Sequence, residues 1–442
     1  MKLSDALRVQ PGESISFSGS GGKTSALIAL ARELENPVIA TTTTHFAKDQ
    51  IGFADRIICS SDIQNSEEFV ESVATGVTLL LGEDRNDNRV SGPPPDQVNE
   101  VYQHARSRGL NVLVEADGSR QRALKAPAAH EPVIPPFTDQ AVVVAGLSAL
   151  GKPLLSKFVH RVDEYRKISG LHEGDEINQD AITRVLANKN GGLKGIPEKA
   201  RRICLLNQAD DVDIQAQGKS LANSLKTSYD SVVVTSFLRH QDPTQELAAI
   251  YDYTVYGVHE PITGIVLAAG GSERMGRPKQ LLSWKGSSLI RFIVSTVINA
   301  GLDHTLVVLG AFEELVSKEI HDLPVEIVVN PHWEDGQSTS VQAGISAVPE
   351  NSGSVIFFLV DQPHLSQTLI RSLVERHAET LSPIIAPIVA GQRGNPVLFD
   401  RSTFDDFLTI QGDAGGRLIF SRYQVSWITW HDEAVLFDID TD

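Results

Sequence analysis

Two glycine-rich segments of the chain contain residue types that can hold phosphate groups. They read SGSGGKTS at residues 18–25 and LAAGGSERMGRPKQLL at residues 267–282. Glycines let backbone N–H groups crowd around a phosphate, and lysine and arginine side chains neutralise its charge. Neither segment has the full spacing of a Walker loop or of a dinucleotide-binding fingerprint. The sequence therefore predicts two phosphate-binding loops of different kinds in one chain.

The longer segment begins with an apolar run that predicts a buried strand. Gly270 and Gly271 would turn the chain and present backbone N–H groups, and Ser272 adds a hydroxyl. Arg274 can form two hydrogen bonds to phosphate oxygens, and Lys279 supplies a compact positive charge. The ordinary alternative is a strand-to-helix turn with two solvated basic residues. The length of the complete string favours phosphate binding over that alternative.

This segment closely resembles the signature of the MobA-like nucleotidyltransferases, L-A-[AG]-G-x-S-x-R-M-G-x-x-K. Ala269 and the QLL after the lysine resemble the molybdenum cofactor cytidylyltransferases, because guanylyl-transferring relatives typically show L-A-G-G. The resemblance covers nearly all of residues 262–442. It continues through NPHWEDGQSTSVQAG (330–344), LVDQPHLS (359–366), GQRGNPVLF (391–399), GDAGGR (412–417) and FDIDTD (437–442).

The resemblance implies transfer of CMP from CTP to molybdopterin that carries molybdenum, with release of pyrophosphate. A terminal phosphate of the pterin would attack the α-phosphorus of CTP, a reaction that depends mainly on positioning and charge neutralisation. Arg274, Lys279 and Asp361 are the candidate catalytic residues. The nucleotide would contact Leu267, Ala268, Ala269, Gly270, Gly271, Ser272 and Gly276.

Two aspartates are the candidate ligands for Mg²⁺, which prefers carboxylate oxygens. Asp361 follows the apolar run VIFFLV, and open α/β sheets bind ligands at the carboxyl ends of their strands. The corresponding aspartate of the family holds Mg²⁺; the ordinary alternative is a capping or turn aspartate before Pro363. Asp440 matches the second acidic residue of the family motif D-x-D-T-P, in which Asp442 replaces the proline. Its alternative is an ordinary solvated acidic residue.

Asn395 departs from the family pattern, in which many relatives have histidine between the glycine and the proline of GQRGNPVLF. Asparagine keeps the ability to form hydrogen bonds, but it cannot carry a proton near neutral pH. We therefore expect Asn395 to keep a contact with the pterin and to have no acid–base role.

The shorter segment has the pattern G-x-x-G-K-[ST], which is shorter than a standard Walker A loop and resembles the ATP loop of Mur-type ligases. It follows a predicted strand and opens a predicted helix, so that loop amides and a helix N-terminus can hold phosphate. The candidate phosphate-binding residues are Gly19, Gly21, Gly22, Lys23 and Thr24. Thr24 could also reach Mg²⁺, and a second NTP is the predicted ligand.

Glu115 and Asp117 end a predicted strand in VLVEADGSR and lie two positions apart, so their side chains face the same way. The pair could orient a metal ion and water; a solvated turn is the alternative. Together with GSGGKTS, TTTTHF, VVVAGLSALGKPL and VHRVDEY, this string resembles the YqeC-type accessory proteins of selenium-dependent or molybdenum hydroxylases. The resemblance implies a molybdenum hydroxylase apoenzyme as partner, and it gives no reaction for this half of the chain.

Short apolar runs alternate with amphipathic helical patterns from end to end, which predicts an α/β fold with mostly parallel sheets. We expect a P-loop-like α/β domain at residues 1–256 and a Rossmann-like nucleotidyltransferase domain at residues 262–442. The segment QELAAIYDYTVYGVHEP (245–261) has a helical start, and its second half is the expected linker.

Composition narrows the classes of partner. The formal net charge of −17 argues against binding to nucleic acid or to an anionic membrane, although a local pocket can still be positive. Two cysteines without a C-x-x-C pair argue against a disulfide framework and a zinc site. Neither a signal-peptide core nor a membrane-spanning apolar run is present in the sequence, so the expected location is the cytoplasm.

Two other interpretations stay open. The chain could transfer a nucleotide to another phosphorylated acceptor, such as a sugar or polyol phosphate. It could also be a non-catalytic chaperone that binds the molybdenum cofactor and docks on a hydroxylase. Arg274, Lys279 and Asp361 count against the chaperone, because a pure carrier needs no triphosphate site.

Overall fold

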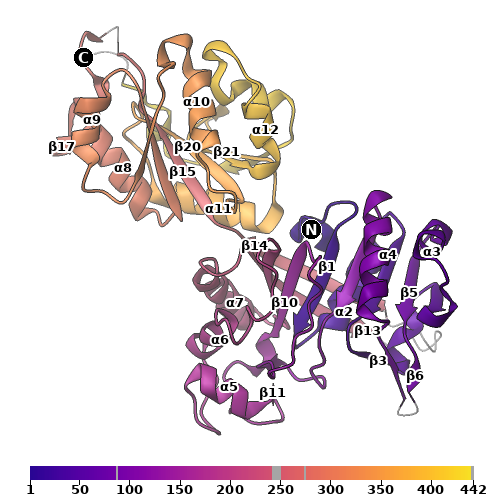
Figure 1. Ribbon diagram of the computed structural model, residues 1–442. Coiled ribbons are helices and arrows are strands. Elements are labelled where there is room, and N and C mark those ends of the chain that lie inside the picture. Colours follow the sequence, from indigo (N-terminus) through magenta and orange to yellow (C-terminus); the bar gives the residue numbers. More distant parts are fainter. Residues whose placement is uncertain (86–87, 241–249, 273–274, 440–442) are drawn as a thin grey trace. The chain divides into compact units, whose positions relative to one another are not determined.

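The computed structural model divides the chain into an N-terminal unit, Met1–His259, and a C-terminal unit, Glu260–Asp442 (Figure 1). In each unit helices pack on a mainly parallel sheet, which confirms the predicted α/β fold class. Arg274 and Asp440, two residues of the predicted site, lie outside the described residues. The structure describes residues 1–85, 88–240, 250–272 and 275–439.

The central sheet of the N-terminal unit has nine strands within the described residues. Their order is β14 (Ile250–His259), β13 (Ser231–His240), β12 (Arg201–Asn207), β10 (Gln140–Gly146), β1 (Ser14–Gly19), β8 (Asn111–Glu115), β2 (Val38–Thr42), β5 (Val77–Leu81) and β4 (Arg56–Cys59). Neighbouring strands are parallel, except that β14 is antiparallel to β13. The central strands are continuous apolar runs, as expected for parallel strands that are buried on both faces.

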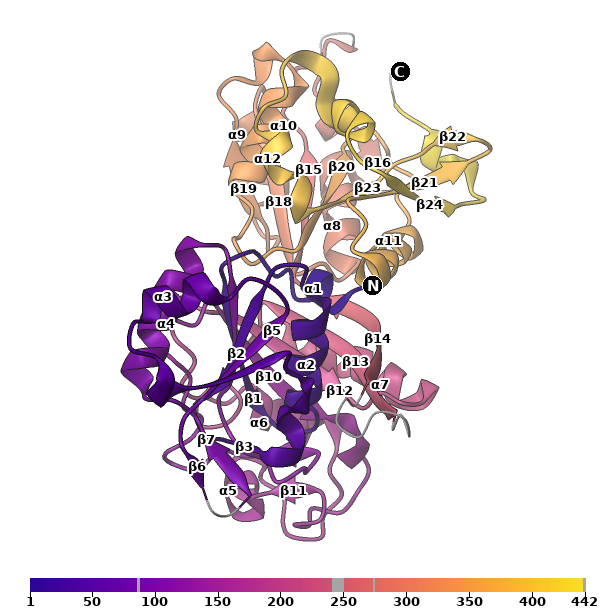
Figure 2. The same ribbon diagram turned by 90° about the vertical axis from the view of Figure 1, so that its right-hand side faces the viewer.

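Helices and short strand pairs surround this sheet. The helices are α1 (Leu3–Ala6), α2 (Lys23–Glu33), α3 (Ser66–Ser72), α4 (Pro95–Ser107), α5 (Val162–Ser169), α6 (Gln179–Leu186) and α7 (Val212–Leu225). The short strands are β3 (His45–Ala47), β7 (Arg89–Ser91) and β6 (Asp84–Arg85) in one sheet, and β9 (Leu124–Lys125) with β11 (Val159–His160) in another. Helices α1 and α2 lie together along the central sheet (Figure 2).

The core of this unit forms where helices cover alternate residues of the strands. Helices α3 and α4 pack against Ile39, Leu80 and Val112. Helices α5, α6 and α7 pack in a second cluster that contains Val143 and Leu206. Alternate residues of a strand face the same side of a sheet, so the apolar runs supply both clusters without interruption.

The segment that we expected to be an irregular linker contains β14, which pairs with β13 over its whole length. The expectation was wrong for residues 253–259, which belong to β14, because this strand is rich in tyrosine, valine and threonine, which favour strands. A neighbouring strand with a free edge supplies the hydrogen bonds that such residues need. The expected helical start at residues 245–249 lies outside the described residues.

The sheet of the C-terminal unit has parallel strands at its centre. Within the described residues the order is β19 (Glu326–Val329), β18 (His304–Leu309), β15 (Ile262–Leu267), β20 (Ser354–Leu359), β23 (Val397–Asp400), β21 (Ile384–Val389) and β22 (Gln392–Arg393), and β24 (Val425–Thr429) pairs with β21. The first four strands are parallel, and β23 is antiparallel to β20. A separate pair joins β16 (Ser283–Trp284) and β17 (Ser287–Ser288).

Helices cover both faces of this sheet (Figure 1). They are α8 (Leu289–Asn299), α9 (Glu313–Ile320), α10 (Gln337–Ser346), α11 (Gln367–Thr380) and α12 (Phe404–Phe407). One cluster joins α8, α9 and α11 to Val266, Val307 and Ile356. The other joins α10 and α12 to Ile265 and Leu306, the strand neighbours of the first set. The alternation shows that the two clusters lie on opposite faces.

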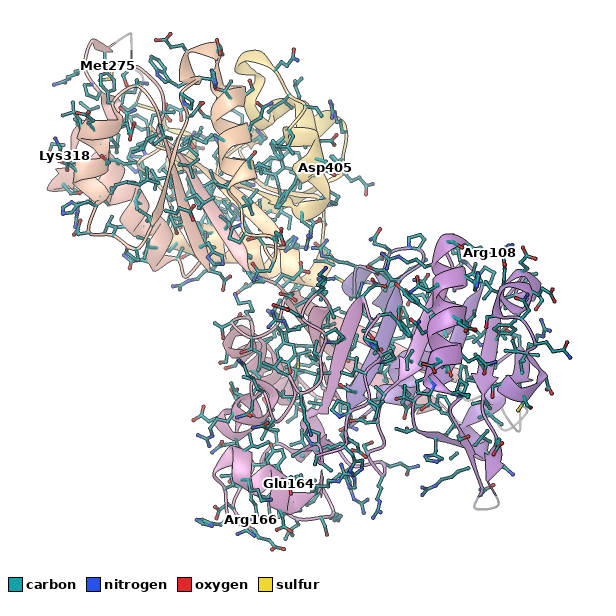
Figure 3. All side chains as sticks on the ribbon, viewed as in Figure 1. Arg108, Glu164, Arg166, Met275, Lys318 and Asp405 are labelled. Carbon is teal, nitrogen blue, oxygen red and sulfur yellow. The ribbon has the colours of Figure 1, made fainter. Side chains whose placement is uncertain are left out.

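Charged side chains cover the outer surfaces of the helices (Figure 3). Arg108 follows α4, Lys318 lies on α9 and Asp405 lies on α12, and all three are exposed. Within the described ranges, no helix combines the length and the apolar content that crossing a membrane requires.

Candidate functional sites

Each predicted loop leaves a strand whose parallel neighbour ends in a predicted acidic residue. The N-terminal loop leaves β1 where Phe17 pairs with Glu115 of β8. The C-terminal loop leaves β15 where Leu267 pairs with Leu359 of β20, and Asp361 follows two residues later. Carboxyl ends of neighbouring parallel strands meet at one edge of a sheet, where open α/β sheets bind ligands. The fold therefore brings each loop to the acidic residue predicted to act with it.

Backbone contacts fix the N-terminal loop between β1 and α2. Ser20 N–H donates to Val144 O at 2.8 Å, and Asn207 Nδ2 donates to Gly21 O at 2.7 Å. Gly21 has φ +87°, and a Cβ there would lie 2.5 Å from Gly146 N, so only glycine fits. Helix α2 begins directly after the loop, which leaves the N–H groups of its first turn available to an anion.

Thr24, Glu115 and Asp117 form a group of oxygen ligands behind this loop. Thr24 Oγ1 donates to Glu115 Oε2 at 2.7 Å. Burial raises the pKa of Glu115, against the opposing charge of Lys23 and the hydrogen bond from Thr24. Asp117 is 1% exposed, and its Oδ1 accepts no hydrogen bond from the described residues. A hydroxyl and two carboxylates fit the ligand preference of Mg²⁺.

Asp117 lies between two lysines. Lys23 Nζ is 3.2 Å from Asp117 Oδ1 and donates to Gly19 O at 2.8 Å. Asp117 Oδ2 accepts hydrogen bonds from Lys125 Nζ at 2.7 Å and from Gly19 N–H at 3.2 Å. The phosphate-loop lysine is therefore held by the loop itself and by the acidic residue at the end of β8.

The contacts continue from Lys125 to the next loop. Lys125 Nζ is 2.6 Å from Glu131 Oε2, and Arg161 donates to both oxygens of Glu131, with Nη2 3.0 Å from Oε1. Although burial raises the pKa of Glu131, the hydrogen bonds from Arg161 and Lys125 outweigh it and lower the pKa to about 2. We call Lys23, Asp117, Lys125, Glu131 and Arg161 the ion chain.

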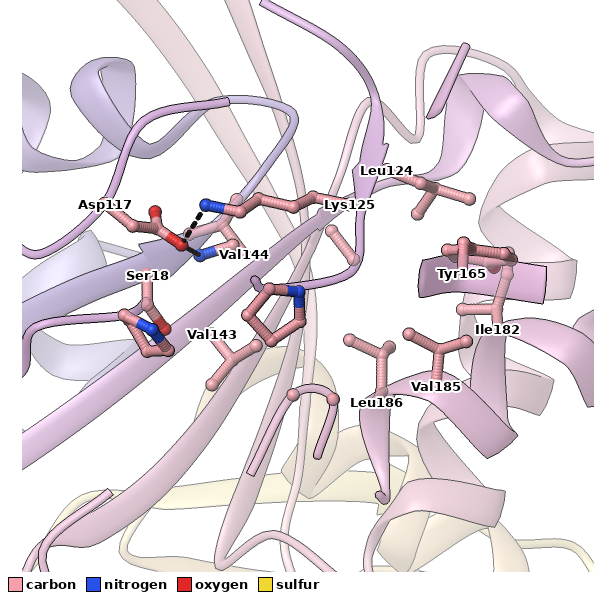
Figure 4. Close-up of a pocket in the computed structure, with 16 residues that line it drawn as sticks. Ser18, Asp117, Leu124, Lys125, Val143, Val144, Tyr165, Ile182, Val185 and Leu186 are labelled. Atoms are coloured by element: carbon pink, nitrogen blue, oxygen red, sulfur yellow. Dashed lines mark hydrogen bonds and ion pairs between the residues drawn. The ribbon is translucent and has the colours of Figure 1, made fainter. Parts of the chain in front are cut away.

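A small apolar cavity of about 30 Å³ adjoins the middle of the ion chain (Figure 4). Asp117 and Lys125 point toward one another at one end, and Tyr165, Val185 and Leu186 lie at the other. Apolar surroundings keep water from the ion pair, which strengthens its electrostatic attraction relative to an exposed pair. The cavity is too small and too apolar for a nucleotide, so it supports the ion chain and is not itself the binding site.

A larger cavity of about 850 Å³ opens on the other side of the loop. Lys23, Thr24 and Glu115 line it together with residues from the loop after β8 and from β11. Its volume lies within the range of about 300–1,000 Å³ that is usual for small-molecule sites. Four of the five predicted phosphate-binding residues, Gly21, Gly22, Lys23 and Thr24, thus border a space that can hold a nucleotide, whereas Gly19 lines the small apolar cavity.

In the C-terminal unit, Lys279 and Asp361 come together across the strand ends. Lys279 Nζ is 3.8 Å from Asp361 Oδ2, and the side chains are 15% and 30% exposed. Residues near the end of the chain lie against the same position, because Ile439 N–H donates to Asp361 O at 2.9 Å and Gln362 Nε2 donates to Asp438 Oδ1 at 2.6 Å. The pair is long and partly solvated, so both side chains can exchange partners when a ligand binds.

Residues 279–280 also fix the first half of the C-terminal loop. Gln280 is buried, with 1% of its surface exposed. Its Nε2 donates to Ala268 O at 2.9 Å and to Gly270 O at 3.0 Å. Lys279 N–H donates to Ser272 Oγ at 3.0 Å. These bonds turn the carbonyl groups of the loop inward, which leaves the outer side of the turn for a ligand.

The described residues of the C-terminal unit offer few metal ligands. No group of three or more His, Cys, Asp or Glu among the described residues of the whole chain is arranged to hold a metal ion by itself. Mg²⁺ commonly takes one or two carboxylates and keeps water and substrate phosphates as its other ligands. Asp361 therefore fits a metal ion that arrives with a triphosphate.

Sequence reasoning missed several residues of both sites. Lys125 and Glu131 lie outside the loop motifs, and only the long-range pairing of β9 with β11 brings them to the loop. Asn207 holds the N-terminal loop, but its string LLNQAD lacks the lysine of the base-reading motif that it partly resembles. Gln362 was not singled out, and it lines a small hollow with Asn395, for which we had expected a contact with the pterin. No local pattern identifies these partners, because each contact joins distant parts of the chain.

Comparison with known proteins gives a family for each unit. The model of the YqeC protein family matches residues 15–163, and the model of the MobA-like NTP transferase domain matches residues 264–427. The chain is 33% identical over 190 residues to nicotine blue oxidoreductase of Paenarthrobacter nicotinovorans, covering 41% of this chain and 92% of that protein.

Two further relatives match over smaller shares of their own length. The uncharacterized protein YqeC of Escherichia coli K12 is 29% identical over 198 residues, which is 44% of this chain and 75% of that protein. A probable molybdenum cofactor guanylyltransferase of Bacillus cereus is 28% identical over 131 residues, which is 29% of this chain and 63% of that protein. Both resemblances seen in the motifs are confirmed by these matches.

Proposed function

We propose that this chain, which belongs to the MobA-like NTP transferase domain family and carries an N-terminal YqeC domain, transfers CMP from CTP to molybdopterin that carries molybdenum. The products are molybdopterin cytosine dinucleotide and pyrophosphate. Membership of the family makes the chain a nucleotidyltransferase. CTP, the pterin acceptor and a molybdenum hydroxylase apoenzyme as recipient of the product are our proposal.

The observation that carries the proposal is the pair formed by Lys279, in the segment that follows β15, and Asp361, just after β20. A cation and a carboxylate 3.8 Å apart, next to a glycine-rich loop, can bind the two charged parts of a metal–triphosphate. Their long, partly solvated contact costs little to open, because exposed ion pairs contribute only about 0–1 kcal/mol.

The proposed roles follow from charge. Lys279 and the N–H groups of Gly270 and Gly271 would hold phosphate oxygens and keep the α-phosphorus in line with the attacking pterin phosphate. Asp361 would hold Mg²⁺. The metal ion, when bound, would neutralise negative charge on the triphosphate as pyrophosphate leaves. Arg274, by the same resemblance, would add a second cation to the triphosphate.

The choice of CTP rests on Ala269. Guanylyl-transferring relatives typically have glycine at this position of the motif, whereas Ala269 is 4% exposed and belongs to the apolar cluster that contains Ile265 and Val308. Its carbonyl also accepts the N–H of Ala311 at 3.0 Å, which fixes its position at the strand end. The choice of CTP therefore depends on the resemblance of the motif to that of the cytidylyltransferases.

For the N-terminal unit we propose nucleotide binding at Gly19, Gly21, Gly22, Lys23 and Thr24. The N–H groups of the loop and of the first turn of α2 would surround the phosphates. Lys23 would exchange part of its contact with Asp117 for a phosphate oxygen. Glu115 and Asp117 would then join Thr24 around Mg²⁺, and the hydrogen bond that already joins Thr24 to Glu115 supports this role.

Transfer of a labelled nucleotide tests the proposal. The full chain is incubated with CTP labelled at the α-phosphate, Mg²⁺ and molybdopterin that carries molybdenum, and the products are separated. We expect label in a pterin dinucleotide, together with free pyrophosphate. Sugar and polyol phosphates are offered as acceptors in parallel. Label transfer to one of these instead of the pterin would assign the enzyme to another acceptor, and binding of the pterin without any transfer would assign it to the chaperones.

A second candidate function has one observation in its favour. The relative with 33% identity over 92% of its length is named an oxidoreductase, not a nucleotidyltransferase. An oxidoreductase needs an electron donor and no triphosphate, so Lys279→Ala would leave such an activity largely intact. Consumption of reduced nicotinamide in the presence of nicotine blue, without CTP, is the measurement that would favour this function.

A further inference from the structure

The large cavity of the N-terminal unit contains many more cations than a phosphate loop needs. Lys23 and the loop N–H groups suffice to bind a nucleotide phosphate. The same cavity is also lined by four arginines and three histidines, against only two acidic side chains. Glu115, one of the two, already bonds to Thr24, and Glu131, the other, is paired with Lys125 and Arg161. The whole chain has a formal net charge of −17, so this local excess of positive charge is specific to the cavity and does not follow from the overall composition.

Four of the basic residues lie together on one side of the cavity, and we call Arg120, Arg122, His160 and Arg161 the basic wall. The parallel pairing of β9 with β11 brings them together, because Lys125 of β9 is opposite His160. Arg122 Nε donates to the carbonyl of Ser156 at 2.7 Å, which ties the two segments a second time.

Arg120 has no partner that explains its position. Neither a hydrogen bond nor an ion pair of its guanidinium is found among the described residues, although it borders the cavity. Its backbone is left-handed, with φ +49°, and those of Gln121 and Arg161 are left-handed as well, with φ +57° and +62°. Such conformations are unfavourable for residues other than glycine and cluster at functional sites. The strained backbone conformations therefore occur at residues that line the cavity, and two of the three are arginines.

The basic wall adjoins the phosphate loop without being part of it. Ser20 Oγ donates to the carbonyl of Arg122, and Gly146 N–H donates to Ala123 O at 2.9 Å. The ion chain then leads from Lys23, on the loop, to Arg161, on the wall. Two cationic surfaces therefore face one cavity and are held in place by a shared set of buried ion pairs.

The neutral member of the wall is His160. Burial, together with the charges of Arg161, Lys125 and Arg120, lowers its pKa to about 4. A neutral imidazole offers one donor and one acceptor, so it can bond to a protonated or an unprotonated phosphate oxygen. The arginines keep their charge at any accessible pH, and their planar forks match phosphate oxygens in pairs.

We infer that the basic wall binds the phosphate group of a second small molecule, which lies in the cavity beside a nucleotide held by the loop. The N-terminal unit would then be a two-substrate site, with one phosphate compound on each cationic surface. This goes beyond the proposed function, which assigns only a nucleotide to this unit. The inference about the basic wall depends on the proposed function only in one respect, namely that a nucleotide occupies the phosphate loop.

Binding of radiolabelled orthophosphate to the full chain tests the inference. Equilibrium dialysis is carried out with saturating ADP and Mg²⁺, so that the loop is filled by a nucleotide. Arg120→Gln removes the unpartnered guanidinium and no packing, and Arg108→Gln removes an exposed guanidinium on the same unit as a matched control (Figure 3). We expect Arg120→Gln to bind phosphate about tenfold more weakly than wild type, and Arg108→Gln to be unchanged.

Two further arms separate this inference from the proposed nucleotide site. Lys23→Ala should lose ADP and keep the phosphate that depends on Arg120, whereas failure of ADP to bind wild type would contradict only the nucleotide proposal. Any binding by the C-terminal unit is common to all variants and cancels in the comparison. Arg122→Gln, as a second wall variant, should behave like Arg120→Gln. The inference is overturned if ADP and phosphate exclude each other, which makes the wall part of the nucleotide site, or if both wall variants bind phosphate as wild type does.

Discussion

Asp117 and Asp361 follow the same kind of strand end, but their surroundings give them different physical roles. Asp117 is 1% exposed and contacts two lysine ammonium groups at 3.2 and 2.7 Å, so its charge belongs to a buried network. Removing one member of such a network leaves an uncompensated buried charge, which costs about 3–5 kcal/mol. Asp361 is partly exposed and 3.8 Å from Lys279, so its carboxylate lies at a solvent-accessible strand end where a ligand can reach it.

At the residue scale the first prediction is that Asp361→Asn abolishes transfer and leaves stability nearly unchanged. The amide keeps the shape and removes the charge that would face the metal. Neutralisation by the metal is worth several kcal/mol in the transition state, so turnover should fall by orders of magnitude at about 1.4 kcal/mol per tenfold. Loss of the exposed ion pair should change the free energy of unfolding by about 0–1 kcal/mol. Kinetics titrated with Mg²⁺ and thermal unfolding measure the two effects.

The matched control for this prediction is Asp405→Asn, which changes an exposed acid on α12 of the same unit (Figure 3). It should alter neither turnover nor stability. A capping role for Asp361 predicts the reverse of our expectation, a loss of up to about 2 kcal/mol in stability with normal turnover. A folded Asp361→Asn protein with the wild-type rate at saturating Mg²⁺ would exclude the metal role.

A second prediction at this scale concerns pH. The pKa of His160 falls from an ordinary 6.5 to about 4, first because of burial and then because of Arg161, Lys125 and Arg120. Between pH 4 and pH 6.5 His160 is protonated in the unfolded chain but not in the folded unit. The free energy of unfolding therefore has its full value above pH 6.5 and decreases as the pH falls toward 4. His160→Gln should reduce this loss, and His172→Gln, at an exposed position of the same unit, should not. Unfolding by denaturant at pH 7 and pH 4.5 gives the comparison; equal slopes for all three proteins would contradict it.

At the element scale the strand-to-helix turn between β1 and α2 is the most constrained feature. Gly21→Ala would place a Cβ 2.5 Å from Gly146 N and 2.6 Å from Ala123 O, both backbone atoms that cannot move aside easily. We expect a loss of about 1–3 kcal/mol in the free energy of unfolding, from overpacking and from the left-handed backbone. Gly118→Ala is the control, because a Cβ there meets nothing within 4 Å. Chemical unfolding of the full chain measures both, and similar losses would show that the turn tolerates a side chain.

The strands that could be predicted are those with continuous apolar runs. β1, β8, β15 and β20 were all expected near their observed positions, because burial on both faces of a parallel sheet requires such runs. β14 was missed because its alternating polar and aromatic residues resemble an irregular linker until β13 is available to pair with it. β24 was missed for a similar reason, since it is an edge strand that depends on β21. Whether β14 and β24 form strands therefore depends on partner strands that the local sequence does not reveal.

The same distinction holds for the sites. Lys23, Thr24 and Lys279 could be predicted from the loop motifs, because a phosphate-binding loop is built from residues that are neighbours in the sequence. The basic wall could not be predicted, since Arg120 and Arg161 lie far apart in sequence and meet only through β9 and β11. Local sequence patterns therefore identify the loop that binds a phosphate. The other side chains that surround the ligand are determined by the pairing of strands that are distant in sequence.

At the scale of the whole molecule, the two loops belong to separate units with separate sheets. We predict that Lys23→Ala abolishes nucleotide binding by the N-terminal unit and leaves cytidylyl transfer at its wild-type rate, because Lys279 and Asp361 keep their surroundings. Binding of a fluorescent ATP analogue and the transfer assay are measured on the same preparation. Loss of transfer in a folded Lys23→Ala protein would show that the two loops serve one reaction.

The central claim, cytidylyl transfer, is tested most directly by comparing kcat/KM for CTP and for GTP with the same molybdenum-loaded pterin. Pyrophosphate release from the full chain is followed at several concentrations of each nucleotide. Because the motif has Ala269 where guanylyl-transferring relatives typically have glycine, we predict that CTP is favoured by at least about tenfold, or about 1.4 kcal/mol in the transition state. Equal or better use of GTP would contradict the choice of nucleotide, and absence of pyrophosphate with either nucleotide would contradict the reaction itself.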